Sequence, residues 1–306
     1  MIMLDLNIID ETSPLTAVVL GTALHSGPVP KPEEAYDPKS LEHILAGTYP
    51  IESDLIREMD GFESVLKKHH VKVFRPEVLS DCNQIFSRDI AFVVDNKLIK
   101  ANILPNRERE FNAIVHVLDQ IGEGQLLLPP DEVHVEGGDV MPWKEFLFVG
   151  TYTGADYPNF ITARTNKAAL TYLQDQFPNR KLIAFELRKS NTDARANALH
   201  LDCCFQPVGQ NLAILHRDSF LNPKDVHWII DYFGADQIFE IDTEEMYRMC
   251  SNIFSISPEV VVSERSFTRL NSWLRKKGIT VEEIDYQEVG KQGGLLRCST
   301  LPLSRS

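Results

Sequence analysis

The sequence has no apolar run long enough to cross a bilayer, and it has a deficit of basic residues. No segment approaches the roughly 20 apolar residues of a membrane-spanning helix, and the opening MIMLDLNIIDE carries acids where a secretory leader carries Lys or Arg. Lys and Arg number 31 against 44 Asp and Glu, a formal net charge of −13. We therefore expect a cytoplasmic protein that binds neither membrane nor nucleic acid, because nucleic-acid phosphates require a basic surface. The same charge favours a cationic ligand.

Cysteine is also scarce. The cysteines at positions 82, 203, 204, 250 and 298 are odd in number and form no Cys-x-x-Cys pair. Neither a disulfide framework nor a structural metal site is expected. Cys298 stands out because it lies close to the end of the sequence, in GGLLRCSTLPLSR. A thiol there either packs in a core that holds the tail or performs chemistry.

One order of elements, strand, strand, helix, strand, returns along the chain. Such repeats stack on their neighbours to bury their faces. The expected copies start at Ile90 (IAFVVDNKLIKANI, a helix over Phe111 to Ile121, LLLP), at Val133 (a strand leading into EGGD, then FLFVGT, a helix over Lys167 to Phe177, KLIAFELR), at Leu199 (HLDCCFQPV, NLAILH, VHWIIDYF, IFEI) and at Ile253 (IFSIS, PEVVVSE, a helix over Phe267 to Lys277, TVEEIDY).

A first copy, with TAVVLG, a helix over Leu55 to Leu66 and VKVFR, lacks one hairpin strand. The segment Leu295 to Leu303 can supply it, which would anchor Cys298 in the core. We therefore predict a single α/β domain over residues 1–306, built from five ββαβ units around an axis as a five-bladed α/β propeller. The alternative is an open mixed α/β sheet. The loop Ser26 to Pro50, rich in Pro and charge, is a candidate lid.

Four short motifs fall where these units begin or end: FSRD (86–89), EGGD (136–139), HLD (200–202) and RCST (297–300). In a radial fold such ends converge. Singly, each has a plain interpretation as a core residue, a turn or a surface ion pair. His200 and Asp202 would share one face of a strand, because side chains alternate along it. The paired glycines of EGGD allow a close backbone approach that aims its acids inward.

Together the motifs have a chemical logic. Three converging carboxylates, Asp89, Glu136 and Asp202, are costly to bury without a cation. A planar guanidinium fits them, because its N–H donors bind carboxylates bidentately. The thiolate of Cys298 would be the nucleophile.

In their order, the motifs resemble those of the guanidino-group modifying enzymes, over about residues 80–303. The closest resemblance is to arginine deiminase, followed by glycine amidinotransferase, dimethylarginine dimethylaminohydrolase and agmatine deiminase. The resemblance implies the pentein fold, which is a five-unit α/β propeller, and a reaction that needs no metal and no organic cofactor.

The resemblance also implies roles for individual residues. Cys298 attacks the guanidinium carbon and forms a covalent thiouronium adduct, while His200 protonates the leaving amine and later activates water or a second amine. Glu136 binds a guanidinium nitrogen and shares in proton transfer. The predicted substrate-binding residues are Asp89, Asp202, Asp139, Phe86, Asn83 and Arg297. For a substrate carboxylate, the candidates are Arg297, Arg164 and Arg195.

The sequence therefore predicts an enzyme that hydrolyses a small guanidino compound, with arginine giving citrulline and ammonia as the leading case. Amidino transfer from arginine to an amine is the alternative, since the same Cys and His serve both outcomes. A binding scaffold without catalysis would not need these side chains together. A cysteine hydrolase acting on amides is disfavoured, because an anionic wall repels an oxyanion. Whether the chain forms a homo-oligomer is left open.

Overall fold

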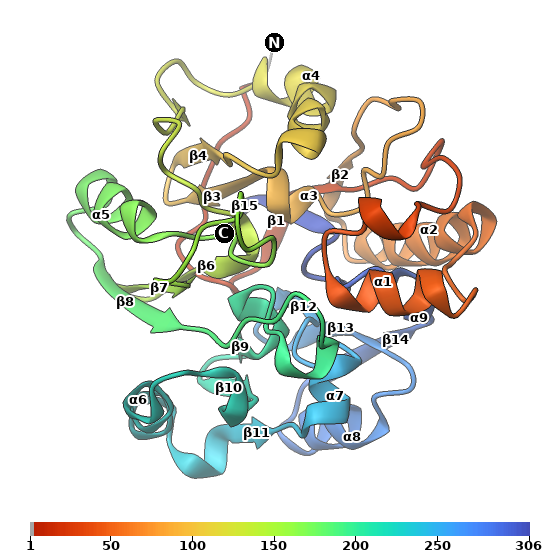
Figure 1. Cartoon of the computed structure of the whole chain (residues 1–306). Coiled ribbons are helices and arrows are strands. Elements are labelled where there is room, and N and C mark those ends of the chain that lie inside the picture. Colours follow the sequence, from red (N-terminus) through yellow and green to blue (C-terminus); the bar gives the residue numbers. More distant parts are fainter. Residues whose placement is uncertain (1–2) are drawn as a thin grey trace.

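The strands form five separate three-stranded sheets in the computed structural model, which describes residues 3–306. Each sheet contains an antiparallel pair of strands and a third strand that runs parallel to the middle strand. Helical segments precede the third strands. Figure 1 shows the sheets set around the middle of the molecule, with most helices toward the outside. The predicted order of strand, strand, helix, strand is confirmed.

The sheets have the following members in chain order: β1 (Leu15–Leu20), β2 (Lys72–Phe74) and β15 (Thr300–Arg305); β3 (Ala91–Val94), β4 (Lys97–Lys100) and β5 (Leu126–Leu127); β6 (Val140–Trp143), β7 (Phe146–Thr151) and β8 (Lys181–Glu186); β9 (Phe205–Val208), β10 (Leu212–Leu215) and β11 (Ile238–Glu240); β12 (Phe254–Ser257), β13 (Val260–Glu264) and β14 (Thr280–Ile284). The α-helices are α1 (Pro38–Leu45), α2 (Glu52–Lys68), α3 (Ser87–Ile90), α4 (Val115–Leu118), α5 (Lys167–Gln176), α6 (Pro223–Phe233), α7 (Thr243–Tyr247), α8 (Thr268–Lys276) and α9 (Gln287–Gly290).

The two ends of the chain share one sheet. β15 pairs antiparallel with β1, so that Thr300 lies opposite Leu20 and Arg305 opposite Leu15. The C-terminal segment therefore supplies the strand that the first unit lacks, as predicted, although the strand begins at Thr300 rather than at Leu295. Because β15 is paired, its apolar side chains are buried and the tail that carries Cys298 is fixed.

Two expected strands begin later than predicted in the described chain. The residues before EGGD form no ladder, and the glycines lie in a 3-10 turn, Gly137–Asp139, that leads into β6. HLD lies in a second 3-10 turn, Leu201–Cys203, and the strand starts only at Phe205. Both segments are fully buried, and continuous burial gives a short turn the same apolar character as a strand. The expectation that His200 and Asp202 share a strand face was therefore wrong.

In place of the helix expected over Phe111 to Ile121, the chain has the end of a 3-10 helix, Pro105–Ile114, followed by the single turn of α4. Val115, placed on the buried face by the apolar spacing, is 44% exposed. A 3-10 turn is tighter and rotates successive side chains by a different angle. A pattern with a 3.6-residue period therefore assigns Val115 to the wrong face.

The proposed lid segment, residues 26–50, contains α1 and a short 3-10 helix, Pro32–Glu34. α1 begins at Pro38, with the Asp37 side chain as its N-cap. From Met3 to the C-terminus, the chain contains no helix that is long and apolar enough to span a membrane.

We predict that the β15–β1 pairing carries much of the stability. Leu301 is fully buried on β15, so Leu301→Ala should lower the free energy of unfolding by about 2–5 kcal/mol in urea titrations. Leu128→Ala is the control, because Leu128 is 65% exposed and its loss should change that free energy by less than about 0.5 kcal/mol. Equal effects of the two changes would contradict a buried closing strand.

Candidate active site

The predicted motifs occupy equivalent places in the fold, directly before the first strand of a unit. FSRD forms α3 and runs into β3, EGGD leads into β6, HLD precedes β9, and RCST leads into β15. This placement brings residues from distant repeats to one common pocket, which we call the Cys298 pocket. The predicted residues that line it are Asn83, Phe86, Asp89, His200 and Cys298.

Cys298 is held from two sides. Asn252 donates from Nδ2 to its Sγ at 3.1 Å and accepts its backbone N–H at 3.1 Å. The thiol donates to Asp202 Oδ2 at 3.5 Å, and the Cys298 carbonyl accepts from the Arg88 amide at 3.0 Å. The side chain is only 3% exposed. The thiol is therefore rigidly placed at the edge of the pocket.

His200 is oriented by Glu136. Its Nε2 lies 2.8 Å from Glu136 Oε2, while Nδ1 lies 3.9 Å from Asp89 Oδ1. Glu136 itself is bound by Arg164, whose Nη1 is 3.1 Å from Oε1 and 3.2 Å from Oε2. All of these side chains are buried. The imidazole therefore has one nitrogen fixed by a carboxylate and the other on the side of Asp89.

The pKa values in this group diverge. Burial opposes ionisation of Glu136, but Arg164 and His200 bring the pKa of its carboxyl down to about 2. Burial alone would lower the pKa of His200, yet its hydrogen bond to Glu136 and the charges of Asp139 and Asp89 raise it. The two side chains therefore behave as an ion pair, with the proton on the imidazole.

The pKa of the Cys298 thiol is raised well above its ordinary value. Burial is the main cause, followed by the negative charges of Asp202 and Asp89. The resting side chain is therefore a thiol, and ionising it requires a nearby positive charge.

Asp89 has one oxygen occupied and one open. Its Oδ2 accepts from Arg107 Nη1 at 2.8 Å, and Arg107 also binds Glu110 bidentately at 2.9 and 3.0 Å. Asp89 Oδ1 is buried and accepts no hydrogen bond from residues 3–306. Burial raises the pKa of this carboxyl, against the effect of Arg107. A buried acceptor of this kind needs a donor, which a ligand can supply.

The glycines of EGGD are required by close packing. A Cβ on Gly138 would lie 2.6 Å from His200 Nδ1, and a Cβ on Gly137 would lie 2.3 Å from the Arg88 carbonyl oxygen. Any larger residue would push His200 or the FSRD turn aside. The close backbone approach that the paired glycines predict is therefore present. The two acids beside the glycines, Glu136 and Asp139, have different partners.

Several predicted residues lie beside the pocket instead of lining it. Glu136 stands behind His200. Asp139 accepts from Thr165 Oγ1 at 2.7 Å and from the Leu201 amide at 2.8 Å. Asp202 and Arg297 bind each other at 2.8 Å. The predicted residues outside the lining are Glu136, Asp139, Asp202 and Arg297.

Among the three arginines proposed for a substrate carboxylate, only Arg164 lines the pocket. Arg195 is exposed and paired with Glu244. Arg297 is fully buried, and its guanidinium binds Glu11, Asp202 and the Val140 carbonyl oxygen. Arg297 therefore holds the structure beneath the site.

Sequence reasoning missed two important residues. Asn252 lies directly before β12, which is the position of the motifs in the other repeats, so aligning the repeats would have identified it. Arg107, which lines the pocket, lies in a 3-10 helix outside any motif, and no sequence signal marks it.

Asp89, Glu136 and His200 each place one oxygen or nitrogen within 4.8 Å of the others, a spacing that a cation can bridge. Two of the three already carry an arginine partner. A planar organic cation fits the remaining open oxygen, Asp89 Oδ1, without displacing those arginines.

The comparisons with known proteins agree with this geometry. Residues 47–305 match the family described as N,N dimethylarginine dimethylhydrolase, eukaryotic. The chain belongs to this family, and thus to the guanidino-group modifying enzymes that the motifs indicated. A curated relative, the uncharacterized protein YkgA of Bacillus subtilis (strain 168), is 26% identical over 242 residues, or 78% of this chain and 77% of YkgA.

Solved structures share the fold at low sequence identity. SxtG, an amidinotransferase from Microseira wollei in saxitoxin biosynthesis, has a TM-score of 0.77 at 16% identity, over 98% of this chain and 97% of that one. The N-terminal domain of ArgZ, an arginine dihydrolase from cyanobacteria, was solved as a variant bound to substrate. It has a TM-score of 0.76 at 13% identity, over 94% and 98% of the two chains.

We predict that Glu136→Gln lowers the pKa of His200. The carboxylate raises that pKa through a hydrogen bond and its charge, and an amide of the same shape removes the charge while burial continues to disfavour the imidazolium. NMR titration of labelled histidine measures the change. Glu132→Gln is the control, because Glu132 is exposed and lies outside the pocket. An unchanged pKa of His200 would contradict the ion pair.

Proposed function

We propose that this protein hydrolyses the guanidino group of a small cationic substrate through a covalent adduct on Cys298. The observation that carries the proposal is one buried pocket that contains a thiol (Cys298), an imidazole (His200) and the open carboxylate oxygen of Asp89. Family membership supports the reaction class. The citrulline-forming hydrolysis of arginine or a methylated arginine is the case we favour.

The steps of the proposed reaction are as follows. The bound guanidinium favours loss of the Cys298 proton to solvent, and the sulfur of the resulting thiolate bonds to the guanidinium carbon. The C–N bond then breaks as the His200 imidazolium gives its proton to the leaving amine, which leaves a thiouronium on Cys298. Water adds to that carbon and gives a proton to His200, the C–S bond breaks, and the ureido product departs.

The neighbouring residues orient this reaction. The free oxygen of Asp89 accepts N–H groups of the substrate. This contact holds the guanidinium carbon in position for attack by the sulfur. Glu136 fixes the ring of His200. Arg164 and Arg107 carry N–H groups at the pocket wall, and they are the candidates for binding a substrate carboxylate. Asp202, Asp139 and Arg297 act from behind, by holding Cys298, Leu201 and the EGGD turn.

We further propose that the five sheets close into a five-bladed propeller around a pseudo-fivefold axis, as one catalytic domain over residues 1–306. The pairing of β15 with β1 supports closure. We propose a cytoplasmic location from the sequence alone. Analytical sedimentation would establish whether the protein assembles into homo-oligomers.

Amidino transfer is the second candidate, and one observation favours it. A larger outer chamber of about 610 Å³ shares Tyr36, Tyr49 and Asn83 with the Cys298 pocket. This chamber has space for an acceptor amine next to the adduct. Incubation with arginine or dimethylarginine, with and without glycine, separates the outcomes. Citrulline indicates hydrolysis, ornithine with ammonia indicates a dihydrolase, and ornithine with an amidinated acceptor indicates transfer.

We predict that Cys298→Ser abolishes turnover and the covalent adduct, because a serine hydroxyl in this site is a far weaker nucleophile. Wild-type protein quenched during turnover should carry the added mass of the amidino intermediate on Cys298, detected by mass spectrometry. His200→Ala should lower kcat by about 10²- to 10⁴-fold. Cys82→Ser, at a cysteine outside the pocket, should retain activity. An active Cys298→Ser variant would refute the proposal.

A further inference from the structure

Asn252, just before β12, is a buried asparagine whose amide is fixed on the Cys298 sulfur. Its Oδ1 accepts the backbone N–H of Cys298 at 3.1 Å, and because a backbone N–H can only donate, this contact determines which end of the amide faces it. Nδ2 therefore faces the sulfur at 3.1 Å, and it also donates to the Asp202 carbonyl oxygen at 3.5 Å. The side chain of Asn252 is fully buried, so its donor group is directed at the sulfur.

The main chain of Asn252 is held as well. Its carbonyl oxygen accepts the Arg297 amide at 3.3 Å, and its own amide donates to the Met249 carbonyl oxygen at 2.9 Å. Asn252 is not among the residues that line the Cys298 pocket, so it reaches the sulfur from outside the space that a substrate would fill. A donor held in this way is in position before substrate arrives, and it acts without rearrangement.

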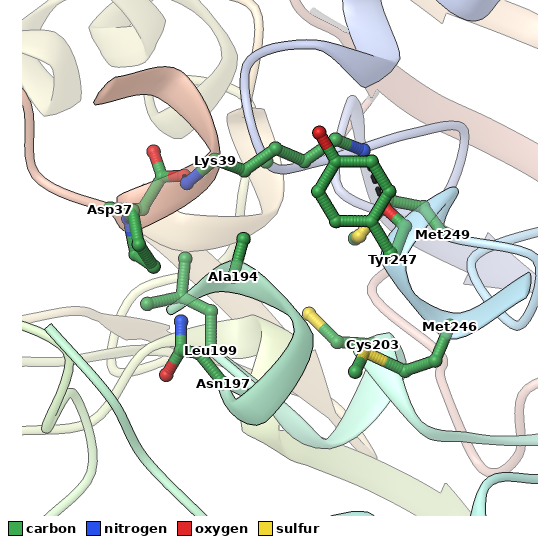
Figure 2. A pocket seen from close by; sticks show the side chains of 11 residues that line it. Asp37, Lys39, Ala194, Asn197, Leu199, Cys203, Met246, Tyr247 and Met249 are labelled. Carbon is green, nitrogen blue, oxygen red and sulfur yellow. Dashed lines mark hydrogen bonds between the residues drawn. The ribbon is translucent and has the colours of Figure 1, made fainter. Parts of the chain in front are cut away.

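The other side chains around the sulfur are mostly acidic. Asp202 Oδ2 accepts from the Cys298 thiol at 3.5 Å, while Oδ1 accepts from the Cys203 thiol at 3.8 Å. Figure 2 shows the Cys203 side chain at a smaller, adjoining cavity. The titratable side chains around Cys298 are Asp89, His200, Asp202, Cys203 and Tyr286. Among the described residues, 3–306, Asn252 is the one side chain that donates to this sulfur, and the Leu295 backbone amide also lowers the pKa of Cys298.

The Asn252 contact discriminates between the two states of Cys298. A neutral thiol is a weak acceptor, whereas a thiolate is charged, and a hydrogen bond to a charged group is roughly twice as strong as a neutral one. When the proton leaves, Asp202 loses the thiol as a donor but keeps Arg297 at 2.8 Å. Ionisation therefore strengthens the contact with Asn252 and leaves Asp202 paired.

We propose that Asn252 is a further catalytic residue, whose Nδ2 stabilises the Cys298 thiolate as the sulfur attacks. The inference rests on the proposed function and deepens it: the guanidinium supplies a positive charge, and Asn252 supplies a fixed hydrogen-bond donor. Without a bound cation, burial and the acids keep Cys298 a thiol. Asn252 neither gains nor loses a proton in the step.

The test measures the ionisation of Cys298 by its alkylation with iodoacetamide. Asn252→Ala should raise the pKa of Cys298 by about 1 to 2 pH units, the loss expected for one hydrogen bond to a charged group. The alkylation rate, followed by mass spectrometry of the Cys298 peptide, should still be rising at the pH where that of the wild type has levelled off. At a fixed lower pH it should be about 3- to 15-fold slower, because the more basic thiolate, though rarer, is the better nucleophile. An unchanged midpoint would overturn the inference.

A matched control separates ionisation from packing. Asn197, labelled in Figure 2, is also buried, and its Oδ1 accepts the Ser190 backbone N–H at 3.1 Å, but it lies outside the Cys298 pocket. Asn197→Ala should leave the midpoint of Cys298 alkylation unchanged, and an equal shift in both variants would overturn the inference. A change of access alone would scale the rate equally at every pH and would not move the midpoint.

If Asn252→Ala fails to fold, Asn252→Asp is the second variant. It keeps the oxygen that accepts the Cys298 amide, but its carboxyl is a stronger acid than the thiol, so the proton stays on the sulfur. The midpoint of Cys298 alkylation should then rise further than in Asn252→Ala. A midpoint equal to that of the wild type would overturn the inference.

Kinetics and calorimetry keep the two proposals distinct. For the compound that the enzyme turns over, Asn252→Ala should lower kcat about 3- to 15-fold with KM within about 2-fold. Arginine should bind Cys298→Ser equally with and without Asn252→Ala, and weaker binding that matches the lost activity would make Asn252 a structural residue. If the wild type modifies no guanidine but the midpoint moves, the proposed function fails and the thiolate contact stands. If catalysis occurs and the midpoint does not move, the inference fails and the function stands.

Discussion

The site depends on one buried cation beneath it. The guanidinium of Arg297 binds Glu11 bidentately at 3.0 Å and Asp202 at 2.8 Å, and it also donates to the Val140 carbonyl oxygen at 2.9 Å. These partners come from the N-terminal segment and from two different repeats, while Arg297 itself adjoins β15. Leaving such charges unpaired costs about 3–5 kcal/mol, so the repeats are fixed relative to one another. Because Cys298 is the next residue, the same cation fixes the thiol.

This arrangement distinguishes structural carboxylates from carboxylates that face a ligand. Arg297 and burial have opposite effects on Glu11, and the cation wins, lowering the pKa of Glu11 to about 2. Asp202 shares that cation. Asp89, by contrast, has an arginine on one oxygen, while its other oxygen accepts no hydrogen bond from residues 3–306. The acidic residues of the motifs are therefore either structural or open to a ligand. An acid is structural where arginine occupies its carboxylate, and it is open to a ligand where one oxygen has no hydrogen-bond donor.

Much of this could be predicted from the sequence. The repeat pattern gave the order of the strands and identified the C-terminal segment as the missing one, because apolar alternation and turn residues are local signals. Strands were wrongly predicted at EGGD and HLD because both segments are buried, and apolar periodicity does not separate a buried turn from a buried strand. The role of Arg297 was missed because an arginine beside a catalytic residue has the same sequence signature whether it points to substrate or to Glu11. Pairing over 286 positions of chain leaves no local trace.

The electrostatics also explain how a thiol with a raised pKa can serve as a nucleophile. Burial, Asp202 and Asp89 all oppose ionisation of Cys298, and this protects the side chain from electrophiles and oxidants, which react with the thiolate. On the proposed function, a guanidinium bound at Asp89 offsets that carboxylate and adds a positive charge beside the sulfur. Both changes lower the pKa of Cys298. His200, bound to Glu136, is fixed in place to give its proton to the leaving amine. On the proposed function, Asp89 thus has two effects: it opposes ionisation of Cys298, and it binds the cation that activates Cys298.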